Sequence, residues 1–182
     1  MSRPLRRGAL RAPLLIAAVL VVVAVSRGCG DDGGSGEPSG PVTVRVTHVV
    51  DGDTIDVRMP GGDEETVRYI GIDTPETVKP DTPVQCGGPE AHDANERLVG
   101  GRTVTLRFDA ERRDVYGRLL AYVYLRPRGE RGHPLFVNAE LVRRGLARTL
   151  TIPPNDSFAA LFARLAARAG AAGRGLWGHC PV

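Results

Sequence analysis

Residues 49–76 read VVDGDTIDVRMPGGDEETVRYIGIDTPE. Two polar clusters stand in this stretch, DGDT at 51–54 and DTPE at 73–76, each at the end of a run with β-strand composition. Carboxylate oxygens are the ligands that hard divalent cations prefer. Arg68, between the clusters, carries a guanidinium fork that matches a phosphate. The stretch therefore predicts a metal site beside a phosphate clamp, as in a metal-dependent phosphodiesterase.

Alternating, β-branched runs along the chain predict five strands. They are residues 42–50, 54–59, 65–72, 102–108 and 118–125. Helical composition predicts three helices. These are residues 89–99, 137–144 and about 157–172. Such an order is typical of a mixed β+α fold, and we expect a five-stranded OB-fold β-barrel packed by three α-helices.

The N-terminal segment, residues 1–28, has the composition of a signal peptide. Four arginines precede an apolar run at residues 14–25, which is short for a membrane span. Three alternatives stay open: a cleaved signal, an uncleaved N-terminal membrane anchor, or lipidation at Cys29, whose surroundings resemble a bacterial lipoprotein attachment site. In each case we expect an exported bacterial protein, extracellular or attached to the outer face of the cell membrane.

Composition then separates a linker from the folded part. Residues 29–41 are rich in Gly, Ser, Pro and acidic residues and predict a flexible linker, so the domain should span 42–182. Residues 43–100 carry 5 basic and 12 acidic residues, whereas residues 101–182 carry 14 basic and 6 acidic residues. An acidic half suits a cation and a basic half suits a polyanion. The alternative is solvated surface of both signs.

The remaining cysteines, Cys86 and Cys180, predict a disulfide bond, because an exported protein meets an oxidising compartment. Two free thiols are the alternative. No Cys/His spacing typical of a metal site accompanies either cysteine. The four histidines share no ligand spacing either, and we expect structural or surface roles for them. They are His48, His92, His133 and His179.

Several motifs together resemble the staphylococcal nuclease (thermonuclease) family, in family order and across residues 43–178. They are DGDT at 51–54, VRYIGIDTPE at 67–76, GPEA at 88–91, DVYGRLLAYVY at 114–124, VNAELVRRGLA at 137–147 and GLW at 175–177. The resemblance implies an OB barrel and a calcium-dependent endonuclease. Such an enzyme hydrolyses phosphodiester bonds of single- or double-stranded DNA or of RNA to 3′-phosphorylated products. We expect a monomer.

The resemblance also implies the ligands of Ca²⁺. Asp53, Asp73 and the carbonyl group of Thr74 resemble the family's metal ligands. Asp51 resembles a carboxylate that lies beside those ligands without holding the metal directly. Two carboxylates, one carbonyl oxygen and waters make an oxygen-only set of the kind that Ca²⁺ accepts.

Four further residues resemble the family's catalytic and substrate-binding groups. Arg68, Glu76 and Arg118 resemble its catalytic trio, and Tyr116 resembles a residue that packs against the substrate. Strand alternation alone does not place Arg68 beside the metal. It lies five residues before Asp73, so the two side chains face opposite ways unless the strand bends near Gly71.

The sequence departs from the family pattern at two places. Val115 replaces the basic residue that often precedes the tyrosine, and residues 148–154 (RTLTIPP) lack the family's tyrosines, which removes a possible base-stacking platform. The alternative function is a catalytically inactive nucleic-acid-binding OB module, and a sugar- or protein-binding OB domain is a third. Neither needs the arginine–glutamate trio together with both aspartate ligands, and this sequence has the complete set.

Overall fold

The computed structural model describes residues 40–77, 83–126 and 132–181. The predicted signal or anchor segment, Cys29 and all but the end of the predicted linker lie outside the described residues. The described residues all belong to one unit of the chain, Ser35–Val182. Among them, no helix is long and apolar enough to cross a membrane.

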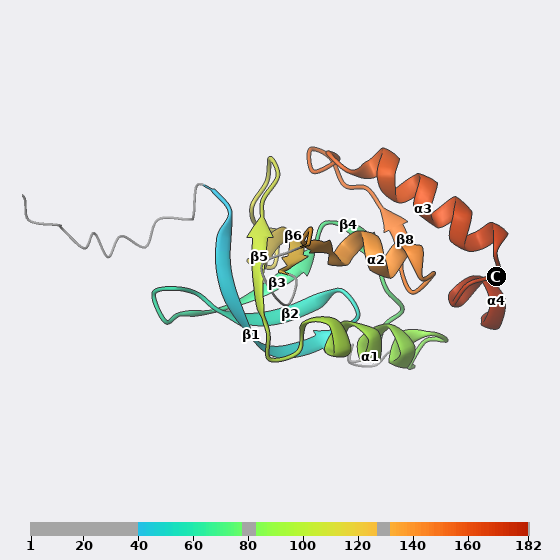
Figure 1. The fold of residues 1–182 in the computed structure, drawn as a ribbon, viewed down its shortest axis with the longest axis horizontal. Helices are drawn as coiled ribbons and strands as arrows, with labels where there is room; N and C mark the ends of the chain where they lie inside the picture. The colour runs from blue at the N-terminus through green and yellow to red at the C-terminus, as the bar shows by residue number, and fades with distance from the viewer. Residues whose placement is uncertain (1–39, 78–82, 127–131, 182) are drawn as a thin grey trace, which may run out of the picture. The chain divides into compact units, whose positions relative to one another are not determined.

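Five strands form a closed barrel (Figure 1). They are β1 (Val42–Asp51), β2 (Thr54–Arg58), β3 (Glu64–Tyr69), β5 (Thr103–Arg107) and β6 (Leu119–Leu125). Neighbours in the order β3-β2-β1-β5-β6 pair antiparallel, and a parallel pairing of β3 with β6 closes the ring. This confirms the predicted five-stranded OB-fold barrel.

Alternation along the strands fills the barrel with apolar side chains, since every second residue faces inward. The buried inward set comprises Val44, Val46, Ile55, Val57, Val67, Tyr69, Val104, Leu106, Ala121 and Val123. The pairing of β1 with β2 shifts register twice, between Val46 and His48 and between Val49 and Asp51. Such bulges bend a strand, and they let β1 pair with both β2 and β5.

Three helices cover the barrel, as predicted. They are α1 (Gly88–Val99), α2 (Val137–Arg143) and α3 (Ala159–Ala171). Helix α1 packs on β1, while α2 lies between β6 and α3 (Figure 1). The sequence patterns missed three short elements, β7 (Leu135–Phe136), β8 (Arg148–Leu150) and α4 (Leu176–His179), because two to four residues are too few to show a period.

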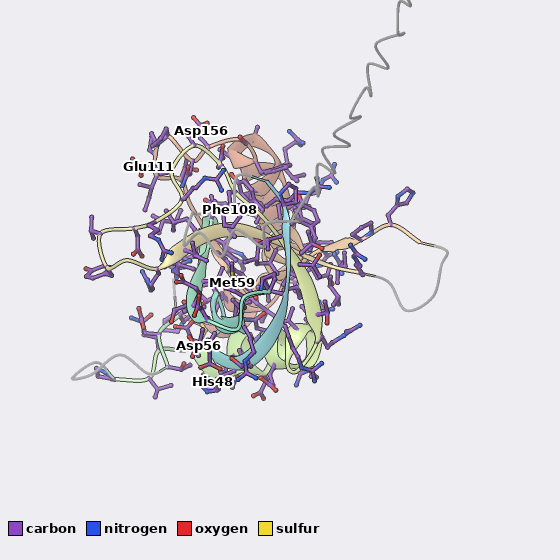
Figure 2. All side chains as sticks on the ribbon, turned by 90° about the vertical axis from the view of Figure 1, so that its left-hand side faces the viewer. His48, Asp56, Met59, Phe108, Glu111 and Asp156 are labelled. Atoms are coloured by element: carbon purple, nitrogen blue, oxygen red, sulfur yellow. A yellow bond between two sulfur atoms is a disulfide. The ribbon has the colours of Figure 1, made fainter. Side chains whose placement is uncertain are left out.

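The histidines take part in local contacts. His48 lies on β1 beside Asp56 of β2, with Nδ1 3.3 Å from the carboxylate, and Figure 2 shows this pair at the bottom of the view, away from Glu111 at the top. The His92 ring nitrogen lies 3.3 Å from the carbonyl oxygen of Val49. These positions agree with structural or surface roles.

The single strand predicted over 65–72 is wrong, because the chain turns at Ile70. Strand β3 ends at Tyr69, and β4 (Gly71–Asp73) leaves the barrel to pair with β8. Gly71 has a φ of 80°, a conformation that favours glycine, and a β-carbon there would overlap the ring of Phe162 on α3. The turn therefore depends both on this glycine and on the packing of the last long helix.

A disulfide bond joins Cys86, just before α1, to Cys180 at the end of α4, with an S–S distance of 2.06 Å. The two cysteines are 94 residues apart in the sequence. In the chain-entropy model, closing a loop of that length stabilises the folded state by roughly 4–5 kcal/mol.

Gly71→Ala should lower the free energy of unfolding by about 3 kcal/mol, because it combines a left-handed backbone with a clash in a packed core. Gly101→Ala is the matched control, since Gly101 has a φ of 61° but no atom within 4 Å of an added β-carbon. The control should lose only about 1 kcal/mol. Urea unfolding measures both values, and equal losses would contradict the packing account.

Candidate active site

The two acidic clusters of the opening stretch meet at one end of the barrel. Asp53 lies in the β1–β2 turn, and its Oδ2 accepts a hydrogen bond from the backbone N–H of Thr74 at 2.7 Å. A β-carbon on Gly52 would lie 2.8 Å from the side chains of Thr74 and Ala91. Only a glycine lets the turn approach Thr74 this closely. The backbone thus fixes Asp53 beside the end of β4.

The turn at Ile70 brings Arg68 to the same place. Its Nη1 donates hydrogen bonds to the carbonyl oxygens of Tyr69 and Ile72, at 2.9 and 2.8 Å. Its Nη2 lies 3.1 Å from Asp53 Oδ2 and 2.9 Å from Asp73 Oδ1. The side chain is only 14% exposed. Arg68 therefore lies between the two aspartates, a position that strand alternation alone did not predict.

Asp53 is a buried carboxyl group among charges of both signs. The pKa of Asp53 is raised to about 7, chiefly by burial and to a smaller extent by the Asp51 and Asp73 charges, while the Arg68 guanidinium and the Thr74 N–H act in the opposite direction. The group is therefore costly to ionise in the metal-free protein. A cation at this position would offset that cost.

Arg118 and Tyr116 come from the loop between β5 and β6. Asp114 accepts hydrogen bonds from the backbone N–H of Tyr116, the backbone N–H of Arg118 and Arg118 Nε, at 2.9, 3.0 and 2.7 Å. The Arg118 guanidinium lies 5.5 Å from the centre of the Tyr116 ring. Within the described residues, Nη1 and Nη2 of Arg118 make no hydrogen bond, so they remain available to a ligand. The sequence patterns did not single out Asp114, which orients this arginine.

A second arginine of the same loop, Arg113, ties it to Glu65 on β3. Arg113 donates to both oxygens of Glu65, at 2.8 and 3.0 Å, and to the carbonyl oxygen of Gly117 at 2.7 Å. The Arg113 hydrogen bond lowers the pKa of Glu65, so the pair stays charged. The loop that carries Tyr116 and Arg118 is thus tied to the strand that carries Arg68.

A cavity of about 480 Å³ unites the eight residues singled out by the sequence. Val50 and Thr54 are its other lining residues. The eight are Asp51, Asp53, Arg68, Asp73, Thr74, Glu76, Tyr116 and Arg118. The carboxylate of Glu76 makes no hydrogen bond or ion pair within the described residues, so it is available to a ligand or a water molecule. The groups predicted to bind a metal, to transfer a proton and to bind a phosphate therefore share one cavity.

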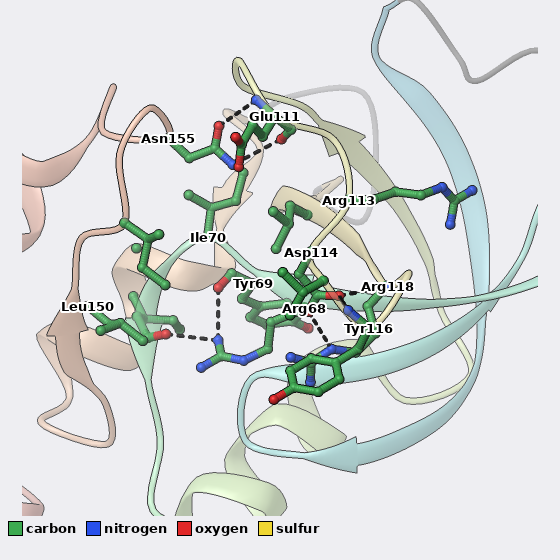
Figure 3. Close-up of a pocket in the computed structure, with 15 residues that line it drawn as sticks. Arg68, Tyr69, Ile70, Glu111, Arg113, Asp114, Tyr116, Arg118, Leu150 and Asn155 are labelled. Carbon is green, nitrogen blue, oxygen red and sulfur yellow. Dashed lines mark hydrogen bonds and ion pairs between the residues drawn. The ribbon is translucent and has the colours of Figure 1, made fainter.

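A second cavity, of about 490 Å³, shares Arg68, Tyr116 and Arg118 with the first. Figure 3 shows Leu150 and Tyr116 on opposite sides of it, with Arg68 between them. Leu150 and Ile152, from the segment that lacks the family's tyrosines, make part of its wall and are 40% and 60% exposed. The sequence predicts only that this segment lacks tyrosines. The structure shows that apolar side chains line the cavity in their place.

The donor set fits a hard divalent cation. Among the described residues, no three His, Cys, Asp or Glu side chains are arranged to hold a metal by themselves. Ca²⁺, however, accepts carbonyl, hydroxyl and water oxygens beside carboxylates. Asp53 and Asp73 supply the carboxylates, and Thr74, whose carbonyl oxygen is the predicted third ligand, lines the same cavity and also carries a buried hydroxyl oxygen that has no hydrogen-bond partner. Asp51 accepts from the backbone N–H of Asp53 at 3.1 Å and so stands beside this set.

The family model for staphylococcal nuclease homologues matches residues 66–179. The chain is 42% identical to a thermonuclease of Staphylococcus intermedius over 148 residues, which is 80% of this chain and 83% of the relative. It is 45% identical to a thermonuclease of Staphylococcus hyicus over 116 residues, and covers 64% of that relative. It is 42% identical to the endonuclease YncB of Bacillus subtilis over 119 residues, 53% of that protein's length. The chain belongs to the staphylococcal nuclease family.

The raised pKa of Asp53 predicts how the free energy of unfolding should vary with pH. Between pH 4 and 7 the metal-free folded protein binds more protons at Asp53 than the unfolded chain does, so the contribution of Asp53 to stability falls as the pH rises. Asp53→Asn removes this titration. Relative to the parent protein, the variant should therefore gain up to about 1.4 kcal/mol per pH unit across the window.

Urea unfolding in EDTA at a series of pH values measures the difference between the two proteins. Asp63→Asn, an exposed aspartate in the β2–β3 turn, is the control and should follow the parent curve. Parallel curves for the parent and Asp53→Asn between pH 4 and 8 would contradict the assignment.

Proposed function

We propose that the protein is a calcium-dependent nuclease that hydrolyses phosphodiester bonds in DNA or RNA and leaves 3′-phosphorylated products. One observation carries the proposal: a single cavity is lined by a cation-binding oxygen set, two arginines and a glutamate with a free carboxylate. The names of the relatives, thermonuclease and endonuclease, support it. We further propose that the protein acts outside the cytoplasm, as its N-terminal sequence suggests.

The arginines perform the phosphate chemistry. Attack of water on a phosphodiester places extra negative charge on the phosphate oxygens, which guanidinium groups stabilise by charge-assisted hydrogen bonds. Arg118 has both terminal nitrogens available, while Arg68 has Nη2 shared between Asp53 and Asp73. Arg68 lines the same cavity, and its Nη2 must exchange an aspartate oxygen for a phosphate oxygen to bind the substrate. When bound, Ca²⁺ supplies additional positive charge to the phosphate oxygens.

Glu76 performs the proton transfer in this proposal. Its carboxylate accepts a proton from the attacking water, whose oxygen forms the new bond to phosphorus. The bond from phosphorus to the 5′ oxygen breaks, and that oxygen takes a proton from solvent water to leave as a hydroxyl group. The phosphate stays on the 3′ oxygen of the other product.

The neighbouring cavity suits the nucleoside next to the phosphate. It shares both arginines and Tyr116 with the first cavity, so a ligand held by its phosphate can extend into it. The exposed ring of Tyr116 offers a face for stacking, whereas Leu150 on the far side offers only apolar contact, as does Ile152, which also lines the cavity. Aromatic stacking contributes roughly 1–3 kcal/mol per base, so this apolar wall should hold a base more weakly than an aromatic one.

Single-stranded DNA incubated with the purified protein should be cleaved in Ca²⁺ and left intact in EDTA. Arg118→Ala should lower kcat by roughly 10²–10³, because a donor to the transition state is lost. Glu76→Gln should lower kcat by roughly 10²–10⁴, because the amide cannot accept the proton.

Arg164→Ala is the matched control, since Arg164 lies exposed on α3 outside both cavities. Gel and mass-spectrometric analysis of the products checks the rates and the position of the phosphate. Full activity in EDTA, or in a protein carrying both site substitutions, would contradict the proposed function. DNA binding without cleavage would favour the inactive nucleic-acid-binding module.

A further inference from the structure

The main chain of Glu76 is held by one residue, Gln85, from the segment that leads into α1. The backbone N–H of Glu76 donates to the side-chain Oε1 of Gln85 at 3.2 Å, and the backbone N–H of Gln85 donates to the carbonyl oxygen of Glu76 at 3.0 Å. The carbonyl oxygen of Gln85 in turn accepts from Gly88 at 3.0 Å. Both main-chain polar groups of Glu76 thus bond to Gln85.

The start of α1 packs against the same stretch of backbone. A β-carbon on Gly88 would lie 2.9 Å from the carbonyl oxygen of Glu76 and 3.1 Å from that of Pro75. No larger residue fits at this position without moving the chain. The backbone of Glu76 is therefore confined by hydrogen bonds from Gln85 and by close packing against Gly88.

The supporting segment is itself attached to the C-terminal end of the chain. Cys86, the neighbour of Gln85, forms the disulfide with Cys180. Gly87 follows, and a β-carbon there would overlap the side chain of Leu176, which is buried in α4. The backbone N–H of Leu176 donates to the carbonyl oxygen of Gly145 at 2.9 Å, which fastens α4 to the loop after α2. The support of Glu76 thus continues through the disulfide into α4.

The other site residues have separate supports. Asp53 and Arg68 are held by the β1–β2 turn, β3 and β4, and Arg118 is held by Asp114. None of these contacts involves Gln85, Cys86 or Cys180. Loosening the segment before α1 should therefore displace Glu76 while leaving the cation-binding and phosphate-binding groups in place.

We propose that Gln85 is a positioning residue for Glu76, and that the Cys86–Cys180 disulfide holds Gln85 in place, so that the rate of cleavage depends on the oxidation state of these two cysteines. The inference rests on the proposed function, in which Glu76 accepts the proton of the attacking water. The position of such a base matters strongly, because a displacement of about 1 Å can lower a rate by roughly 10²-fold.

The test compares kcat, KM and Ca²⁺ affinity in a Cys29→Ser background, which removes the third thiol of the chain. Gln85→Ala should lower kcat at least about tenfold, with KM for single-stranded DNA and the calorimetric Ca²⁺ affinity unchanged. Val84→Ala is its matched control, since Val84 is adjacent and 61% exposed. Its kcat should equal that of the parent protein.

Reduction of the parent by a phosphine should produce a similar fall in kcat. Cys86→Ser combined with Cys180→Ser should be equally slow and insensitive to the reductant. All assays are run below the unfolding transition of each protein, as followed by circular dichroism.

A purely structural disulfide would lower the unfolding temperature of the reduced protein but leave the kcat of the folded protein unchanged, and that result would overturn the inference. Equal kcat values for Gln85→Ala and Val84→Ala would also overturn it. If the parent protein itself shows no Ca²⁺-dependent cleavage, the proposed function fails, and the inference fails with it.

Discussion

The site depends on the hydrogen bonds and ion pairs of the Arg68 guanidinium group. It joins two carboxylates, Asp53 and Asp73, and two backbone carbonyl groups from the turn between β3 and β4. Without it, the buried Asp53 would face Asp51 and Asp73 with no compensating side-chain charge among those that act on its pKa. Removing one partner of a buried ion pair typically costs more than the pair contributes. The position of Arg68 also requires the change of chain direction at Gly71. That change requires Gly71 to pack closely against Phe162.

Closure of the barrel brings the acidic and basic halves of the chain together. Strand β3 pairs in parallel with β6, with Arg68 opposite Leu120, so Arg118 lies two residues from the residue that faces Arg68. The pair of Arg113 with Glu65 reinforces the same junction. A single parallel pairing therefore places the predicted cation site of the first half beside Arg118, the proposed phosphate-binding arginine of the second half. The overall charge of the chain would not reveal this arrangement.

Much of the fold was predictable from local patterns. Alternation and helical composition gave the five barrel strands and the three longer helices, because each is long enough to show its period. The patterns failed where tertiary packing decides, and the clearest case is Arg68. Strand alternation alone predicts that Arg68 and Asp73 face opposite ways. In the structure, Gly71 has a positive φ and interrupts the predicted strand, and both side chains line one cavity. The resemblance to a family, rather than strand spacing, had indicated this contact.

The supporting residues of the site were harder to predict. Asp114 and Gln85 act through hydrogen bonds to backbone groups, and such roles leave no period or motif that a sequence pattern can register. Leu150 and Ile152 reach their cavity through β8 and the turn after it, elements too short to anticipate. The residues that carry the reactive groups can thus be predicted from the sequence. The contacts that orient these side chains form only in the folded chain.

A crystal structure with Ca²⁺ and a phosphorothioate dinucleotide would test the central claim most directly. The claim is that one cavity holds the cation, the phosphate and the general base Glu76 together. The account predicts the cation on Asp53, Asp73 and Thr74, the phosphorothioate between Arg68 and Arg118, and Glu76 beside the phosphorus atom. A phosphorothioate bound elsewhere, or a cation that does not contact Asp53, would contradict it.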